Sequence, residues 1–554
     1  MLLAARQQDV ARNHQEIREK LADFESFGDI FDQITSKEFA ELRADLQSGH
    51  FRPSQVLHAF QRKAIELNQS LNCVTWFLSE AENQADHLDG LGTKERQAMP
   101  LYGMPFSVKE NFHLKGHVIC RGTATGLASE VPTKDCNLIT YLKHLGAIPF
   151  CRTNVPATMV SISCSNIVYG ATHNPHALNC SPGGSSGGET SLIAAGGAPF
   201  GLGSDLAGSM RIPAHCCGIT TLKPTAGRLC VHGAAKAQIG CGRLPHSYGF
   251  FARSPDTIDY LMSLVVCESY WVGIPKMVPL KYEPVRDLPK HLRIGYVLDD
   301  GWLRPHPSIQ RAVQRTAEFL SNQGHELVQF QIPDPFEAAD LLQRSLIVDN
   351  GQYLLETLEF DPKLDPIFAP TARAMQLPLF LRSLLSHIPT LPDRWPQLFT
   401  INAAFQRSIA DVSRTNDRVD EYVARFTDLW LQSHLDALIV PGFAVPAPKH
   451  NLTGRISAVT ALSTGLYNLL NYPAGTVPVH FINDQDRSAF MDQATQSLLA
   501  DPFGHVITKA TDNAAKLPVG IQVVTQPYKE ELCVALMKLI HGRLTDTDMK
   551  RFRL

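Results

Sequence analysis

Glycine and hydroxyl residues are concentrated between Asn179 and Pro224, and this stretch constrains the chain more than any other. It contains Pro182-Gly183-Gly184-Ser185-Ser186-Gly187-Gly188 and, further on, Gly203-Ser204-Asp205-Leu206-Ala207-Gly208-Ser209. Glycine allows positive φ and lets the backbone approach a ligand closely, and serine supplies a nucleophile or a proton relay. The stretch therefore predicts the active site of a serine hydrolase.

The bulk composition indicates a globular protein. The chain has 554 residues, of which 44% are hydrophobic and 19% charged, with a net charge of -3. Such a balance gives no electrostatic footprint for nucleic acid. The start of the chain is too weakly apolar for a signal peptide, and no apolar run is long enough to span a bilayer. We expect an intracellular, cytoplasmic protein without a transmembrane helix.

The cysteines indicate neither a metal site nor a disulfide framework. Twelve are scattered from Cys73 to Cys533, and no pair or Cys/His cluster has zinc-ligand spacing. No Gly-Lys-Ser/Thr follows the glycine-rich run, which excludes a phosphate-binding loop of that type. We expect free, mostly buried thiols, no metal and no cofactor.

The chain is expected to form one catalytic domain over residues 51–545, preceded by a helical arm at 1–50. Within the arm, Thr35 and Glu38 have the spacing of a capping box ahead of a stripe made by Phe39, Leu42 and Leu46. From about residue 100 onward, short apolar runs alternate with helical patterns. The predicted helices cover 54–67 and 140–145, and the predicted strands 73–78, 105–108, 147–151 and 292–297. This alternation is typical of an α/β protein with a largely buried sheet.

Residues 366–390 differ from the rest because prolines punctuate an apolar helical pattern. One interpretation is an ordinary pair of buried helices. The other is a hydrophobic cap lying in a membrane interface, with arginines near the lipid headgroups. The residues of this candidate cap are Leu377, Phe380, Leu381, Leu384, Leu385 and Ile388.

Gly183–Gly187 matches G-x-S-x-G, the pattern of a nucleophile elbow. That elbow needs a hydrophobic strand directly before it, and the residues from His173 to Cys180 do not form one. A flexible glycine-serine turn is a simpler interpretation of this match. Ser209 is the better nucleophile, because the small residues before it can direct several backbone N–H groups toward one point, as an oxyanion hole requires.

A serine nucleophile also needs a base, and two residues are candidates. His215 follows Pro213 and is more simply explained as a structural residue. Lys109 follows an apolar strand, where a lysine is costly unless its pKa falls. A buried neutral lysine can act as a general base. A lysine that reaches solvent from a strand end is the alternative.

Together these motifs resemble the amidase signature family, and more narrowly its fatty acid amide hydrolases. The likeness extends over roughly residues 50–545. It is carried by the lysine motif, by the two glycine-serine motifs in family order, and by several shorter segments. Those segments are Asn72–Thr75, Lys115–His117, Cys164–Asn166, Gly218-Ile219, Leu222–Thr225, Leu466–Asn468, Pro473–Gly475, Val477–Val479, Leu517–Val519 and Glu530–Cys533. The resemblance implies the family's fold, with α/β/α layers around a large central mixed β-sheet.

The resemblance also implies a mechanism. Ser209 attacks the amide carbonyl, Ser185 follows a cis peptide bond and relays the proton, and neutral Lys109 is the ultimate base. Ser186 and Ser204 match hydroxyls that support this relay. Met159 and Ser185 match positions in the substrate pocket. The backbone N–H groups that would hold the oxyanion belong to Leu206, Ala207, Gly208 and Ser209.

Three departures from the family bear on specificity and attachment. Ala207 stands where glycine is usual, so its N–H serves the oxyanion only if φ is negative there. Val160 and Ile162 replace aromatic residues near the acyl chain, which leaves the preferred acyl length open. A charged arm stands where fatty acid amide hydrolases of the mammalian type carry a transmembrane helix, so membrane attachment would rest on the 366–390 cap.

The resemblance implies a hydrolase that converts N-acylethanolamines or primary fatty amides into a fatty acid and an amine. It further implies a homodimer in peripheral contact with an internal membrane. A general amidase, or an amidotransferase subunit that hydrolyses glutamine, is the enzymatic alternative. A catalytically silent lipid-binding scaffold built on the same fold is the non-enzymatic one.

Overall fold

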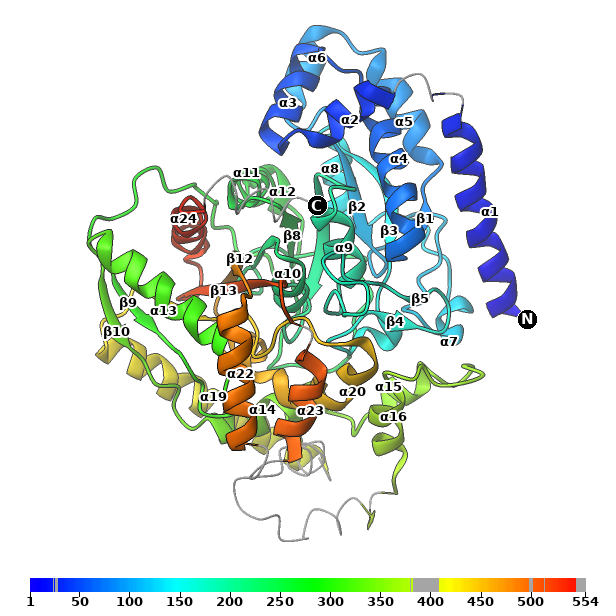
Figure 1. The fold of residues 1–554 in the computed structure, drawn as a ribbon. Helices are drawn as coiled ribbons and strands as arrows, with labels where there is room; N and C mark the ends of the chain where they lie inside the picture. Colours follow the sequence, from blue (N-terminus) through cyan, green and yellow to red (C-terminus); the bar gives the residue numbers. More distant parts are fainter. Residues whose placement is uncertain are drawn as a thin grey trace.

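A mixed sheet of eleven strands forms the centre of the computed structural model (Figure 1). The structure describes residues 1–22, 24, 28–378, 380–381, 408–497, 502–512 and 514–544. In spatial order the strands are β1 (Val74–Phe77), β3 (Ile148–Thr153), β2 (Pro105–Lys109), β6 (Phe200–Asp205), β8 (Ser247–Ala252), β7 (Thr220–Lys223), β12 (Ala474–Phe481), β13 (Pro518–Thr525), β11 (Ala437–Pro441), β9 (Arg293–Tyr296) and β10 (Glu326–Gln329). A separate two-stranded ribbon pairs β4 (Ser165–Asn166) with β5 (Gly170–Ala171).

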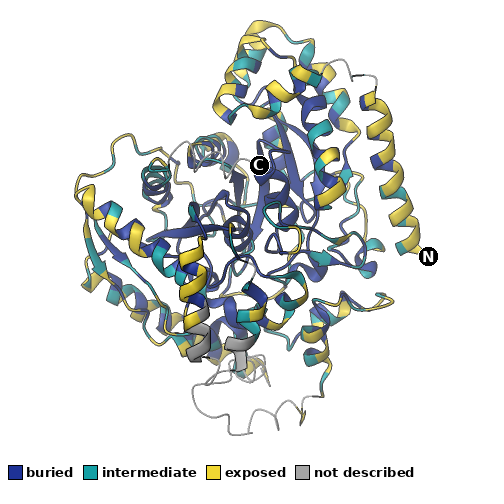
Figure 2. Ribbon diagram, viewed as in Figure 1, coloured by how far each residue is buried: buried dark blue, intermediate teal, exposed yellow. Residues whose placement is uncertain are grey.

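The sheet is mixed, as the sequence predicts. Strand β2 runs parallel to both β3 and β6, and β9 runs parallel to β10 and β11, while the strands from β6 through β13 to β11 pair antiparallel. Strand β11 shows that both faces are covered. Its Ala437 and Ile439 belong to one hydrophobic core, and Leu438 and Val440 to another. The prediction of a largely buried α/β sheet is confirmed, and Figure 2 shows the central strands in dark blue.

Helices flank the sheet on both sides. In the first half of the chain they are α1 (Leu2–Ala22), α2 (Gly28–Ser36), α3 (Phe39–Ser48), α4 (Pro53–Leu71), α5 (Glu80–Asp89), α6 (Thr93–Ala98), α7 (Ala124–Leu127), α8 (Asn137–His144), α9 (Gly187–Ala194), α10 (Arg211–Cys217), α11 (Pro255–Val265) and α12 (Glu268–Trp271). In the second half they are α13 (Pro307–Asn322), α14 (Pro335–Leu346), α15 (Gln352–Glu356), α16 (Ala369–Gln376), α19 (Ile409–Gln432), α20 (Thr453–Thr460), α21 (Leu462–Leu469), α22 (Asp484–Ser497), α23 (Pro502–Thr511) and α24 (Glu530–His541). Short 3₁₀ turns occur at Ala157–Met159 and His450–Leu452.

The predicted capping box at Thr35 and Glu38 is wrong by three residues. Thr35 lies inside α2, where its hydroxyl donates to the Phe31 carbonyl at 3.1 Å. Helix α3 begins after Glu38, whose backbone N–H donates to the Glu41 carboxylate at 3.3 Å. The sequence pattern fits both registers, and the end of α2 at Ser36 decides between them.

Only part of the candidate cap falls within the described residues. Leu377 is half-buried, Phe380 is 71% exposed and Leu381 is 36% exposed. Leu384, Leu385 and Ile388 lie outside the described residues. Among the helices that the structure describes, none combines the length and the apolar character needed to cross a bilayer.

Helix α1 covers the free edge of the sheet at β1. The Asn13 side chain donates to the Phe77 carbonyl at 3.0 Å and accepts from the Phe77 N–H at 2.8 Å. It thereby satisfies both backbone hydrogen-bonding groups of this edge-strand residue. Unpaired edge groups invite pairing with other chains, so this amide protects the edge. The Arg6 guanidinium stacks over Trp76 of the same strand at 4.5 Å from the ring centroid.

We expect Asn13→Ala to raise amide hydrogen exchange at Phe77, because a buried donor that loses its partner costs about 1–3 kcal/mol. Hydrogen–deuterium exchange of the 74–78 peptide measures the effect. Gln15→Ala is the matched control, since this exposed amide donates to Glu19 one turn away and makes no other hydrogen bond within the described residues. Equal exchange in both variants would show that Asn13 does not protect the edge.

Candidate active site

Lys109 ends the central strand β2, and its amino group is completely buried. Its Nζ lies 2.9 Å from Ser185 Oγ, 3.0 Å from Ser204 Oγ and 3.3 Å from the Ser204 carbonyl oxygen. A neutral amine has two N–H donors and one lone pair. It can satisfy all three contacts if one serine hydroxyl donates to the lone pair. The structure thus brings Lys109, Ser185 and Ser204 together.

Burial lowers the pKa of Lys109 to about 7, although the nearby Asp205, Cys164 and Glu189 oppose the shift. Glu189 is itself buried, and burial raises the pKa of its carboxyl to about 8. A carboxyl that stays largely protonated at neutral pH provides little countercharge for an ammonium group. A substantial fraction of Lys109 is therefore neutral near pH 7.

Ser185 stands in the turn that leads into α9. The Gly184–Ser185 peptide bond is cis, which confirms the geometry expected from the resemblance. A Cβ on Gly184 would lie 2.1 Å from the Ser163 carbonyl oxygen, so only glycine fits there. The neighbouring Ser186 hydroxyl is buried and has no hydrogen-bond partner among the described residues. Ser186 therefore contacts neither Lys109 nor Ser185 through its hydroxyl, unlike Ser204, which does contact Lys109.

Ser209 lies in the loop between β6 and α10, and a backbone contact joins this loop to the Ser185 turn. The Ser186 N–H donates to the Ser209 carbonyl at 3.2 Å. The two halves of the glycine-serine stretch, separate in sequence, thus meet beside Lys109. His215, the alternative base, lies in α10 with Nδ1 3.2 Å from the Gly520 carbonyl oxygen, and burial lowers its pKa to about 4. It has no hydrogen bond to either serine, which agrees with a structural role.

The loop Leu206–Ser209 contains three uncommitted backbone donors instead of the four expected. The N–H groups of Leu206, Ala207 and Ser209 make none of the hydrogen bonds found in the described part of the chain. The Gly208 N–H, in contrast, already donates to Asp205 Oδ1 at 2.7 Å. Ala207 is not among the residues with positive φ, so replacing glycine there does not strain the loop.

A buried ion pair holds this loop. Burial alone would raise the pKa of Asp205, but the Arg211 guanidinium and the Asn468 amide hold it well below its usual range. Arg211 donates to Asp205 through Nε at 3.2 Å and Nη2 at 3.1 Å, and Asn468 donates to it at 2.8 Å. The Asp205 carboxylate also accepts the Met210 N–H at 3.0 Å. Asp205 and Asn468 stand within motifs of the sequence that gave them no role, and Arg211 lies just beyond the second glycine-serine motif.

Asn111 is a further polar residue of the site, and the sequence alone gave it no role. Its amide lies 3.3 Å from Ser204 Oγ and donates to the Ala235 carbonyl at 3.0 Å. It stands two positions after Lys109 in the same motif, which is the signal that could have identified it. Asn111 connects the lysine cluster to the segment 233–239.

The loop opens into a cavity of about 130 Å³. Four residues of the expected substrate site, Met159, Leu206, Ala207 and Ser209, line it, whereas Ser185 and Gly208 do not. The larger apolar side chains of the remaining wall are Val160, Ile162, Ile212, Leu346, Ile347 and Met375, and its polar ones are Ser161, Gln343, Thr371 and Ser457. Met375 belongs to α16, which leads toward the candidate cap. The cavity is suited to an apolar group attached to a carbonyl at Ser209.

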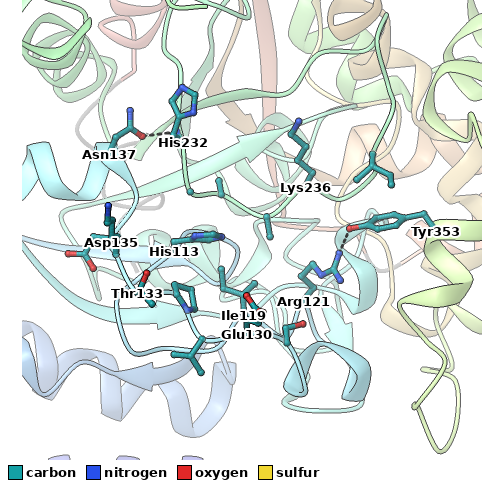
Figure 3. A pocket seen from close by; sticks show the side chains of 18 residues that line it. His113, Ile119, Arg121, Glu130, Thr133, Asp135, Asn137, His232, Lys236 and Tyr353 are labelled. Carbon is teal, nitrogen blue, oxygen red and sulfur yellow. Dashed lines mark hydrogen bonds between the residues drawn. The ribbon is translucent and has the colours of Figure 1, made fainter. Parts of the chain in front are cut away.

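A second, larger cavity of about 820 Å³ lies along the segment 233–239 (Figure 3). Gly233–Lys236 and Ile239 line it, whereas Ala237 of the same segment lines the smaller cavity. Arg121 and Tyr353 are hydrogen-bonded to each other at its wall. Nothing in the sequence pointed to this cavity. Within the described ranges, no group of three or more histidine, cysteine, aspartate or glutamate side chains could hold a metal ion.

Comparison with known proteins identifies relatives of this chain. The family model described as Amidase matches residues 55–534. Fatty acid amide hydrolase 1 of Caenorhabditis elegans is 33% identical over 529 residues, covering 93% of this chain and 89% of the relative. Fatty-acid amide hydrolase 1 of Sus scrofa is 34% identical over 504 residues, covering 90% and 84%. A solved structure of a fatty acid amide hydrolase superposes with a TM-score of 0.82 at 22% identity, covering 99% of this chain and 95% of that one.

Proposed function

This chain belongs to the amidase family and is an amide-hydrolysing enzyme, and from that premise we propose that its substrates are fatty acid amides. The products would be a free fatty acid and an amine, as from N-acylethanolamines or primary fatty amides. The observation that carries the proposal is the aliphatic cavity lined by Ser209 and Met375. The names of the two most similar relatives reported above support the same substrate class.

In the proposed mechanism, Ser209 Oγ attacks the amide carbonyl carbon as its proton passes to Ser185. Ser185 in turn gives its own proton to neutral Lys109, with which it is in hydrogen-bond contact at 2.9 Å. The negative charge on the carbonyl oxygen is stabilised by the uncommitted N–H groups of Leu206, Ala207 and Ser209. One such donor is typically worth about 3 kcal/mol in the transition state.

The acyl-enzyme then forms and breaks down through the same relay. The protonated lysine returns a proton through Ser185 to the nitrogen of the leaving amine, and the C–N bond breaks. A water molecule loses a proton to the relay and attacks the acyl-Ser209 ester. Collapse of that intermediate releases the carboxylic acid and restores the Ser209 hydroxyl and neutral Lys109.

Membrane contact and assembly are further parts of the proposal. We propose peripheral association with an internal membrane through residues 366–390, supported by the exposed Phe380 and Leu381 near α16. A homodimer is proposed from the resemblance alone. The alternative of a glutamine-hydrolysing enzyme is less well supported, because a polar, charged substrate gains little from aliphatic walls.

We expect the protein to hydrolyse a long-chain acylethanolamide much faster than glutamine when the two are assayed side by side. Release of free fatty acid and of ammonia from glutamine are the two measurements. Turnover of glutamine alone would contradict the lipid proposal. Turnover of neither, together with no labelling by a fluorophosphonate, would favour the catalytically silent scaffold.

Ser209→Ala should abolish both fluorophosphonate labelling and amide turnover, because it removes the proposed nucleophile. Intact-protein mass spectrometry detects the adduct. Ser457→Ala is the control, since Ser457 lines the same cavity and has no assigned role. Labelling that persists at Ser185 in the Ser209→Ala protein would restore the nucleophile-elbow interpretation.

The rate constant kcat/KM should fall about tenfold per pH unit below pH 7, where Lys109, with its pKa of about 7, becomes charged and can no longer accept a proton. Lys109→Ala should lower activity strongly and leave a rate that keeps rising into alkaline solution. Lys223→Met is the matched control, because burial also lowers the pKa of Lys223 to about 7, yet its Nζ donates to the Pro224 carbonyl. If the fall of kcat/KM below pH 7 disappeared in Lys223→Met but persisted in Lys109→Ala, Lys109 would be excluded as the base.

A further inference from the structure

The peptide unit between Ala207 and Gly208 is held at both of its polar ends. Thr464 Oγ1 donates to the Ala207 carbonyl at 2.8 Å, and the Gly208 N–H donates to Asp205 Oδ1 at 2.7 Å. In a trans peptide the carbonyl and the N–H point in opposite directions. A hydroxyl on one side and a carboxylate on the other therefore fix one orientation of this peptide.

The reverse orientation is disfavoured by the same two groups. A peptide turned over would direct the Ala207 carbonyl toward the Asp205 carboxylate, which is an acceptor without a donor. It would also cost the fully buried Thr464 hydroxyl its 2.8 Å contact with the Ala207 carbonyl, leaving it the longer contact with the Ala461 carbonyl at 3.4 Å.

Thr464 is itself fixed by the ion pair that holds the loop. Arg211 Nη1 donates to the Thr464 carbonyl at 2.8 Å, while Nε and Nη2 of the same side chain bind Asp205. Thr464 belongs to α21, more than 250 residues along the chain from Ala207. Arg211 thus links the two residues that hold the Ala207–Gly208 peptide, Asp205 at its N–H and Thr464 at its carbonyl.

Thr464 lies so close to the loop that only glycine fits at position 208. Gly208 has a φ of +118°, and a Cβ there would lie 2.1 Å from Thr464 Oγ1. The hydroxyl therefore lies directly against the loop backbone. The N–H groups of Ala207 and Ser209, which flank this peptide, are uncommitted, and both residues line the smaller cavity.

We propose that Thr464 is a positioning residue for the oxyanion site. By holding the Ala207 carbonyl, it fixes the backbone angles at Ala207 and Gly208 and thereby the directions of the N–H groups on either side. Thr464 touches no reacting atom and acts only through the loop. This inference rests on the proposed function, because it assigns those N–H groups to the oxyanion.

The test compares Thr464→Val, which removes the hydroxyl at nearly constant volume, with Thr464→Ser, which keeps it. For Thr464→Val we expect kcat on a long-chain acylethanolamide to fall about tenfold to a hundredfold while KM stays within about twofold. An oxyanion contact strengthens only in the transition state, so its loss appears in kcat. The fluorophosphonate labelling rate should fall in parallel, and Thr464→Ser should retain kcat within about threefold of the wild type.

Thr460→Val is the matched control. Thr460 is equally buried and donates to the Ile456 carbonyl at 2.9 Å within its own helix, so its loss removes a similar hydrogen bond that does not reach the loop. Its kcat should match the wild type even if its melting temperature falls. Thr464→Ala serves as a second hydroxyl-free variant should Thr464→Val not fold, and melting temperatures are measured for the wild type and all four variants.

Wild-type kcat and labelling rate in both hydroxyl-free variants would overturn the proposal, as would an equal loss in Thr460→Val. A drop in kcat that Thr464→Ser does not restore would also overturn it, because the hydroxyl would then not be the cause. A wild-type protein that neither labels nor turns over amides would contradict the proposed function itself, and that result is distinct from any difference among the variants.

Discussion

The burial of the Lys109 amino group is the constraint on which the site depends. A charged ammonium in a fully buried position at the end of a central strand would be strongly disfavoured. The fold tolerates the group because its pKa falls to about 7 and because oxygen atoms of Ser185 and Ser204 lie within hydrogen-bond distance. The same two conditions give the group access to a proton on a serine hydroxyl.

Strand β6 separates the Lys109 amino group from the buried, charged carboxylate of Asp205. Successive side chains of a strand point to opposite faces, so Ser204 and Asp205 face different environments. Ser204 contacts Lys109, whereas Asp205 is paired with Arg211 and Asn468. Breaking a buried pair by removing one partner typically costs about 3–5 kcal/mol. The lysine with its lowered pKa and the charged carboxylate thus lie in different environments, because the lysine contacts Ser204 and the carboxylate belongs to the next residue of β6.

The parts of the site that could be predicted from sequence are those fixed by local chemistry. Glycines mark where the backbone must come close, as at Gly184, and an isolated lysine after an apolar strand marks an unusual pKa. These signals, together with the resemblance, were enough to bring Lys109, Ser185 and Ser209 into one hypothesis. The buried α/β sheet followed from the alternation of strand and helix patterns, and its large mixed form followed from the resemblance.

The parts that escaped depend on contacts between distant segments. The contact of Thr464 with Ala207 joins residues 257 positions apart and exists only once α21 lies against the loop. The unpartnered Ser186 hydroxyl is likewise invisible in the sequence, where Ser186 and Ser204 looked equivalent. The capping box at Thr35 failed for a related reason, because the end of the preceding helix was not determined by its own residues.

Lys223 shows why burial alone does not make a base. Burial lowers the pKa of Lys223 to about 7, as it does for Lys109, and both lysines end strands of the same sheet. The Nζ of Lys223 donates to a carbonyl oxygen, which has no proton to give. The Nζ of Lys109 lies against a hydroxyl, which can give one and receive another. The difference between a buried lysine and the proton acceptor of the proposed reaction therefore lies in the partner atom, and the glycine-serine turn supplies a hydroxyl as that partner.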